Sequence, residues 1–268
     1  IEIELNQSFC LEPGFIEELY APRDERRIRP GDRVFYTRQN ARRLDNYRRL
    51  LGNYSHAVQS MFLGPLLSEA SIHANTAGVF KGFYKDRRTK TGRFGGTNAD
   101  ALSRIKKDIL LDTPILSRFE CEYEVFQEDA NELVRELKDL DLAYFDPPYN
   151  QHPYGSNYFM LNLLVNYERP HEISKVSGIP ADWNRSDYNV RARSLERMKE
   201  LVENTDAKFL LISFNNEGFI DPREMQALLA KIGPVEIIEI PYNTFRGSRN
   251  FRKRSIHVTE RLFLVERR

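Results

Sequence analysis

Apolar residues follow two different patterns along this chain of 268 residues. In the first part they recur at helical spacing, which predicts helices over about 41–51, 53–72 and 99–110. Further along, short apolar runs alternate with amphipathic stretches, a pattern typical of strands separated by helices. We expect strands at 122–127, 141–145, 208–213, 234–240 and 261–266, and helices at 130–138, 157–166, 190–204 and 222–231.

The alternation of strands and helices predicts an α/β domain with a largely parallel sheet. The start of the chain differs, because its predicted elements are helical and its basic residues are dense. We therefore expect a mostly helical, basic region over 1–110 and an α/β domain over 111–268.

The composition is that of an ordinary globular protein, with 41% hydrophobic and 29% charged residues. No apolar run approaches the roughly 20 residues of a membrane-spanning helix, and no secretory signal is visible. Cys10 and Cys121 are too few for a disulfide framework. These features predict a cytoplasmic protein without a membrane association.

Charge is balanced overall, at 40 basic and 39 acidic residues, so any surface for a polyanion must be local. Two basic clusters lack balancing acids and contain interleaved aromatic residues, which favours contact with nucleic-acid phosphates. The candidate DNA-binding residues in them are Lys85, Arg87, Arg88, Lys90, Arg93, Arg246, Arg249 and Arg252. By contrast, the arginines between residues 23 and 49 are interspersed with acids, and we interpret them as a solvated surface.

The most informative stretch is the apolar run 141–145, which leads directly into Asp146, Pro147, Pro148 and Tyr149. Ligands of parallel sheets bind beyond the carboxyl ends of the strands, where Asp146 is predicted to lie. The two prolines fix φ and lack N–H donors, so they hold a stiff backbone whose carbonyls need partners. Rigid acceptors beside an aromatic ring suit a planar group that carries an amino group, such as adenine or cytosine. The alternative is that the prolines only end the strand and that Asp146 caps the next helix.

This stretch resembles the catalytic motif [Asp/Asn/Ser]-Pro-Pro-[Tyr/Phe/Trp] of the amino-group DNA methyltransferases, and its Asp form is typical of adenine-specific enzymes. Flanking segments at 124–130, 154–158, 212–218 and 242–247 resemble the Dam-related bacterial subgroup. The resemblance implies a Rossmann-like methyltransferase sheet, S-adenosylmethionine as the cofactor and double-stranded DNA as the substrate. It also implies a place in a bacterial restriction-modification system.

The resemblance further implies roles for individual residues. The target adenine is swung out of the duplex, Tyr149 stacks on it, and the Asp146 carboxylate and the Pro147 carbonyl accept hydrogen bonds from its amino group. The methyl group is then transferred directly, so that catalysis rests on positioning and electrostatic preorganisation. The implied catalytic residues are Asp146, Pro147, Pro148 and Tyr149, and the implied cofactor-binding residues are Asp129, Ala130 and Asp146.

The family's cofactor loop, a Phe-x-Gly-x-Gly turn after a first strand, has no counterpart here. The glycine-rich segment 92–96 follows a polar run instead of a buried strand, so it is interpreted as a flexible basic loop. The family's first two strands and an initiating Met are also missing. We therefore expect a sheet that is incomplete at its N-terminal strands, with the cofactor site completed by an N-terminal segment or by a partner chain.

Two other functions remain open from the sequence. The chain could be a non-catalytic DNA-binding subunit or fragment, as the missing cofactor loop suggests. It could also methylate RNA or a protein glutamine, although the glutamine-methylating relatives favour Asn at the position of Asp146 and the basic loops favour nucleic acid. None of the five histidines has a partner at metal-ligand spacing, so no metal centre is expected.

Overall fold

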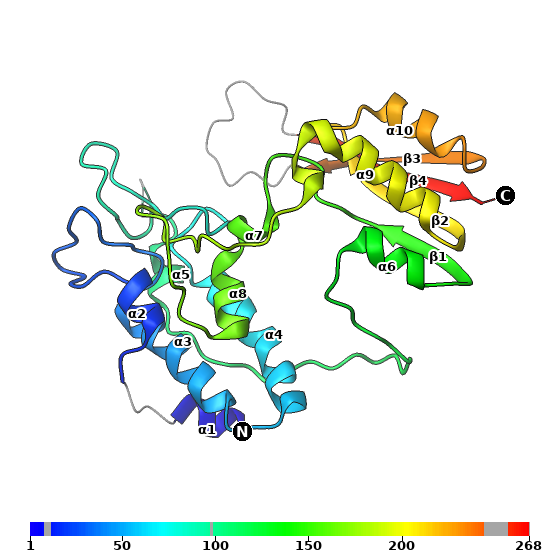
Figure 1. The fold of residues 1–268 in the computed structure, drawn as a ribbon. Coiled ribbons are helices and arrows are strands. Elements are labelled where there is room, and N and C mark those ends of the chain that lie inside the picture. Colours follow the sequence, from blue (N-terminus) through cyan, green and yellow to red (C-terminus); the bar gives the residue numbers. More distant parts are fainter. Residues whose placement is uncertain (8–11, 97–98, 244–256, 268) are drawn as a thin grey trace. The chain divides into compact units, whose positions relative to one another are not determined.

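The computed structural model of the chain describes residues 1–7, 12–96, 99–243 and 257–267 (Figure 1). Its contacts divide the chain into two compact units. The helical unit consists of Ile1–Glu120 and Gly155–Asn184, and the sheet unit consists of Cys121–Tyr154 and Arg185–Arg268. The helical unit therefore contains a segment from the middle of the chain in addition to the N-terminal residues.

The helical unit is built around an aromatic core. Phe35 packs edge-on against Phe159, with the ring centroids 5.9 Å apart, and Tyr20 contacts both rings. Because Phe159 belongs to the later segment, this core explains why residues 155–184 group with the N-terminal helices. The helices are α1 (Glu2–Gln7), α2 (Phe15–Tyr20), α3 (Arg38–Leu51), α4 (His56–Ile72), α5 (Leu102–Lys106) and α8 (Phe159–Asn166), and the short α7 (Tyr154–Asn157) begins where the chain enters the unit.

The helices predicted at 41–51 and 53–72 are confirmed as α3 and α4, but the helix predicted at 99–110 is shorter. The side chain of Asn40, buried in α3, explains the early end of α5. Its amide donates to the carbonyl of Lys107 at 2.9 Å, and its oxygen accepts from the backbone N–H of Ile109 at 3.0 Å. These bonds hold the chain after Lys107 in an extended path, which a continued helix could not follow.

Glu17 joins α2 to α3, and its side chain is almost fully buried. It accepts hydrogen bonds from Arg38 at 2.8 Å and from Arg42 at 2.5 Å. Burial alone would raise the pKa of this carboxyl, but the two arginines outweigh burial and the pKa is lowered. The ionised form is therefore favoured in the folded protein.

We expect Glu17→Gln to lower the free energy of unfolding by about 1–3 kcal/mol at neutral pH, because charge-assisted hydrogen bonds are lost. Since the folded-state pKa of Glu17 lies below its ordinary value of 4.5, this contribution is present above pH 4.5 and is lost as the pH falls through the folded pKa. Urea unfolding at several pH values measures the difference. The neighbouring Glu18→Gln, which breaks an exposed pair with Arg169, serves as the control and should cost under about 0.5 kcal/mol.

The sheet unit contains one four-stranded sheet in the order β1-β2-β4-β3. The strands are β1 (Leu140–Phe145), β2 (Ala207–Asn215), β3 (Val235–Asn243) and β4 (His257–Glu266). Only β1 and β2 are parallel, whereas β4 runs antiparallel to both β2 and β3. The prediction of a largely parallel sheet is therefore wrong. The sequence between β3 and β4 is basic and offers no apolar helix face, and an antiparallel pair needs no crossover helix.

The predicted strand at 122–127 does not form. This segment has no regular secondary structure and is exposed, with Tyr123 at 85% of its full accessibility, and no neighbouring strand pairs with it within the described part of the chain. Its alternation of apolar and charged residues favours a strand, but a strand forms only where a partner supplies the ladder hydrogen bonds.

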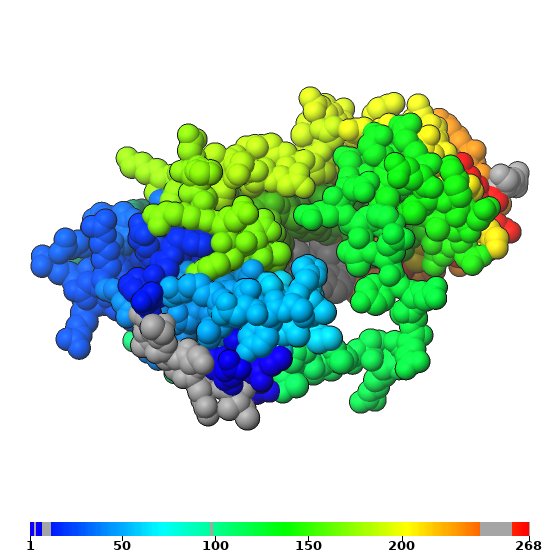
Figure 2. All heavy atoms as spheres, turned by 60° about the horizontal axis from the view of Figure 1, so that its bottom comes forward, coloured from blue at the N-terminus to red at the C-terminus, as the bar shows by residue number. Residues whose placement is uncertain are grey.

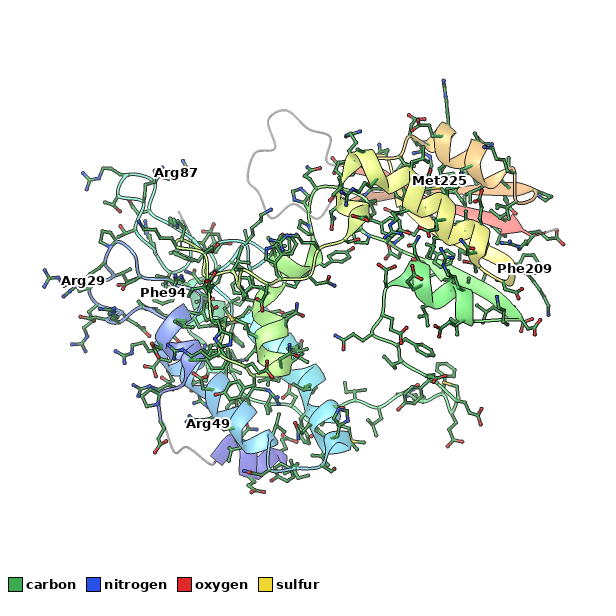
Figure 3. All side chains as sticks on the ribbon, viewed as in Figure 1. Arg29, Arg49, Arg87, Phe94, Phe209 and Met225 are labelled. Atoms are coloured by element: carbon green, nitrogen blue, oxygen red, sulfur yellow. The ribbon has the colours of Figure 1, made fainter. Side chains whose placement is uncertain are left out.

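The two faces of the sheet have different surroundings. One face forms the hydrophobic core together with the helices α6 (Ala130–Glu136), α9 (Arg191–Asn204) and α10 (Pro222–Leu229) and the short helix η1 (Asp187–Asn189). Leu210 and Ile212 are buried on this face. Because side chains alternate along a strand, Phe209 and its register partner Leu142 lie on the other face. That face is apolar and open: Leu142, Tyr144, Phe209, Ile238 and Ile240 are all exposed. Figure 3 labels Phe209 on β2 and the buried Met225 on α10.

Within the described residues, no helix is both long enough and apolar enough to cross a membrane. The longest, α4, has 17 residues and contains Pro65.

Candidate active site

The segment from Asp146 to Tyr149 lies at the carboxyl end of the parallel pair in the sheet unit. β1 ends at Phe145, which pairs with Ile212 of β2, and Asp146 follows directly. The strand predicted at 141–145 and the loop that follows it are confirmed. The carboxyl ends of parallel strands are where α/β sheets place their ligand-binding residues.

Asp146 does not cap a helix. The next helix, α7, begins only at Tyr154, and the Asp146 side chain makes no hydrogen bond within the described residues. The carboxylate is exposed, yet partial desolvation by its surroundings raises its pKa. An acceptor with no internal partner is available for a bound ligand.

Three contacts fix Tyr149 in place. Its hydroxyl accepts a hydrogen bond from the Asn215 side-chain amide at 2.9 Å, and its carbonyl accepts from the backbone N–H of Phe219 at 2.7 Å. Its ring lies 5.5 Å from that of Phe214, at an angle of 60°. Tyr149 is half-buried, so one part of the ring remains accessible.

The turn after β2 explains how Asn215 reaches Tyr149. The Asn215 side-chain oxygen accepts from the backbone N–H of Glu217 at 2.9 Å, which orients its amide group. Gly218 follows, and a Cβ there would come within 2.2 Å of the Phe214 ring, so only glycine fits. The sequence alone did not predict the contact between Asn215 and Tyr149, because it joins residues 66 positions apart.

A second carboxylate, Glu260 of β4, belongs to the site. It lies opposite Asn215 in the antiparallel register and accepts a hydrogen bond from the Ser213 hydroxyl at 2.9 Å. Burial and the negative charge of Asp146 raise the pKa of Glu260. The pKa of Tyr149 is raised to about 12, mainly by burial and in addition by Glu260 and other nearby groups. The sequence held no signal for Glu260, because its place depends on the unexpected antiparallel pairing of β4.

Asp129 and Ala130 begin helix α6. Asp129 is the N-cap residue, and its side chain accepts from the backbone N–H of Asn131 at 2.9 Å. Both residues are exposed. Helix α6 leads into β1 through residues 137–139 and lies beside that strand (Figure 1).

The first basic cluster forms a tight turn in the helical unit. Lys85 and Gly92 form an antiparallel bridge, and Asp86 accepts from the backbone N–H groups of Arg88 and Thr89 at 2.9 and 2.8 Å. The basic residues of the cluster surround this turn, with Arg87, Arg88, Lys90 and Arg93 exposed and Lys85 partly buried. Two aromatic residues of this cluster are not exposed partners for bases, because Phe80 is buried in the core and Phe83 packs against it. Arg246, Arg249 and Arg252 lie outside the described residues.

The glycine-rich segment 92–96 is not a nucleotide-binding loop between a strand and a helix. Asn75 anchors it, since the Asn75 side-chain oxygen accepts from the backbone N–H of Gly95 at 3.0 Å and its amide donates to the Arg93 carbonyl at 3.1 Å. Gly95 has a φ of +79°, which favours glycine.

The contact between Asn215 and Tyr149 should be measurable as a coupling energy. We expect Asn215→Ala and Tyr149→Phe to show an interaction of about 1 kcal/mol in a double-mutant cycle, because each removes the same hydrogen bond. Urea unfolding followed by circular dichroism measures it. Strictly additive effects of the two substitutions would contradict the contact.

Comparison with known proteins assigns the family. The model of the D12 class N6 adenine-specific DNA methyltransferases matches residues 16–227. The chain belongs to this family, whose members use S-adenosylmethionine as the methyl donor.

Several curated relatives are type II DNA methyltransferases. The chain is 30% identical over 241 residues to the type II methyltransferase M.CviAII of Paramecium bursaria Chlorella virus 1, with 88% of this chain and 65% of the relative aligned. It is 27% identical to the modification methylase StsI of Streptococcus sanguinis, over 95% of this chain and 37% of that protein. It is 24% identical to the type II methyltransferase M.NlaIII of Neisseria lactamica, over 87% of this chain and 69% of that protein. The chain thus spans less than two thirds of the length of the first two of these relatives. No solved structure shows a significant match.

Proposed function

We propose that the chain supplies the catalytic motif and the DNA-contacting surface of an adenine-specific DNA methyltransferase. The methyl group of S-adenosylmethionine is transferred to the exocyclic amino group of a flipped adenine, in a cytoplasmic restriction-modification system. The observation that carries this proposal is the Asp146 carboxylate at the carboxyl end of β1, which has no hydrogen-bond partner among the described residues and lies beside a Tyr149 ring held by Asn215.

We assign each residue of the motif a role that the geometry supports. Tyr149 is fixed and accessible, so it stacks on the extruded adenine, which is unreachable inside the duplex. Asp146 and the carbonyl of Pro147 accept hydrogen bonds from the amino group, and Pro148 keeps the backbone of this acceptor array rigid. The bonds draw the nitrogen lone pair out of conjugation with the ring, which makes the nitrogen a better nucleophile.

The charges around the site also support methyl transfer to the amino nitrogen. Positive charge moves to the adenine amino nitrogen as the methyl group arrives, and Asp146 and Glu260 provide negative charge on that side. The amino proton becomes acidic once the nitrogen is methylated, so it leaves to Asp146 or to water without a strong base.

The acidic surroundings also fit the cofactor. A sulfonium is a cation, and three carboxylates, from Asp146, Glu217 and Glu260, act on Tyr149. S-adenosylmethionine supplies an activated methyl group when it is bound. We assign Asp129 and Ala130, at the start of α6, to its adenosine end and Asp146 to its methyl end.

The cofactor site is completed, in this proposal, by a polypeptide segment outside the described sheet, either N-terminal or from a partner chain. Two features of the sheet unit support it. Within the described ranges, the face that bears Leu142 and Tyr144 is apolar and exposed, and the segment 122–127 has strand character without a strand partner. A segment that packs on this face and offers a free strand edge would provide a partner for both. The same features favour the second candidate, a DNA-binding subunit without turnover of its own.

The helical unit is proposed to hold the DNA. Its basic turn provides Lys85, Arg87, Arg88, Lys90 and Arg93 for phosphate contacts, and residues 1–110 contain the target-recognition segment. We propose that Arg246, Arg249 and Arg252 contribute further phosphate contacts.

A methyl-transfer assay tests the proposal. Radiolabelled S-adenosylmethionine is offered with duplex DNA, RNA or protein as acceptor, and we expect label only in duplex DNA. Label in RNA or protein would contradict the proposed substrate. Calorimetric titration of S-adenosylmethionine into this chain alone separates the two candidates, because saturable binding would exclude a subunit that lacks a cofactor site.

A further inference from the structure

A second basic loop lies next to the turn at 85–93, over residues 23–33, and we call it the arginine loop. It contains five arginines and three acids, and the sequence alone predicts a solvated surface in which the acids balance the arginines. In the structure these acids bind backbone N–H groups instead. Figure 2 shows the loop, in blue, projecting from the helical unit.

Each acid of the arginine loop bonds to backbone N–H groups. Asp24 accepts from the N–H of Arg26 at 2.9 Å, and Asp32 accepts from the N–H of Arg29 at 2.7 Å. Glu25 accepts from the N–H of Arg38, at the start of α3, at 2.6 Å. The acids therefore shape the loop and do not pair with the arginine side chains at its tip.

Three arginines remain directed to solvent. Arg26, Arg27 and Arg29 are exposed, and across the described ranges none of them forms an ion pair with a carboxylate. Such long cationic side chains without internal partners are suited to bind phosphate oxygens.

The loop is held in a defined conformation. Arg29, Pro30, Gly31 and Asp32 form a turn closed by the N–H of Asp32 and the carbonyl of Arg29 at 3.1 Å, and Gly31 has a φ of +96°. Proline followed by glycine with positive φ is the pattern of a type II turn. Arg33 fixes the end of the loop by donating to the carbonyls of Leu19 and Ser174.

The arginine loop and the turn at 85–93 share a base. A Cβ at Gly92 would lie 2.2 Å from the side chain of Val34, the residue that follows the loop. Asn75 donates to the carbonyls of both Val34, at 2.7 Å, and Arg93, at 3.1 Å. Figure 3 shows Arg29 and Arg87 extending from the same side of the helical unit.

We infer that the arginine loop binds the phosphate backbone of duplex DNA, through Arg26, Arg27 and Arg29, and continues the surface formed by the turn at 85–93. The inference rests on the proposed function, since it adds phosphate contacts to the same DNA-binding unit. In both loops the acids build the turn and the basic side chains face outward, which concentrates positive charge on one surface of a protein with a net charge of only +1.

Salt-dependent DNA binding tests the inference. Fluorescence anisotropy of a labelled duplex is measured at about 50 to 200 mM salt, and the slope of log affinity against log salt is compared between the parent and Arg26→Gln/Arg27→Gln/Arg29→Gln. We expect the slope to fall by about one for each arginine that contacts a phosphate, and the affinity to fall for all sequences alike.

The control removes the same charge elsewhere. Lys138→Gln/Arg223→Gln/Lys231→Gln replaces three exposed basic residues of the sheet unit and should leave the slope unchanged. If Arg87→Gln/Arg88→Gln/Lys90→Gln lowers the slope but the arginine-loop variant does not, the inference is wrong and the proposed function stands. If the parent itself shows no salt-dependent binding to duplex DNA, both are wrong.

Discussion

Replacement of Asp146 by alanine should reduce the rate of methyl transfer by about 10²–10³-fold, because it removes a preorganised acceptor aimed at the charge that develops on the amino nitrogen. In single-turnover assays of the assembled enzyme, the loss should fall on the rate constant and leave the affinity for duplex DNA unchanged. Asp141→Ala provides the control. It removes an exposed carboxylate of the same strand, whose partner is the surface residue Lys208, and should retain nearly full activity.

The pH dependence offers a second readout of Asp146. The ionised carboxylate is the stronger acceptor for the amino group, and partial desolvation raises the pKa of Asp146 above its ordinary value of 3.8. The rate should therefore fall on acidification at a pH above the ordinary range of aspartate. If the rate of Asp146→Asn falls on acidification in the same way as that of the parent, the fall is due to another group.

Replacement of Tyr149 by alanine should weaken binding of the flipped adenine by about 1–3 kcal/mol, the usual value of a base–aromatic stack. Tyr149→Phe is the matched variant, because it keeps the ring and removes only the hydrogen bond to Asn215. We expect most of the activity to remain in the phenylalanine variant. Comparable losses in both variants would mean that the hydroxyl, and not the ring, makes the important contact.

The sequence was sufficient to predict most helices of the chain, because they depend on local periodicity and caps. Helix α10 is an example: Asp221 caps it, Pro222 begins it, and Glu224 completes a capping box. The position of Asp146 at a strand end was equally predictable, since an apolar run followed by an acid and two prolines is typical of a strand that ends there.

Features that depend on pairing between distant segments could not be predicted. The direction of β4, and with it the place of Glu260, follows from pairing with β2 about 45 residues earlier in the chain. The segment 122–127 has the composition of a strand but no partner within the described residues. The acids of the arginine loop could be distinguished from counter-ions only once their hydrogen bonds to backbone N–H groups were known.

The most direct test of the account is the chemical identity of the methylated base. Duplex DNA treated with the assembled enzyme and S-adenosylmethionine is digested to nucleosides and analysed by mass spectrometry. We expect N6-methyladenine with the parent enzyme and almost none with Asp146→Ala. Methylated cytosine as the product, or equal amounts of N6-methyladenine from both proteins, would contradict it.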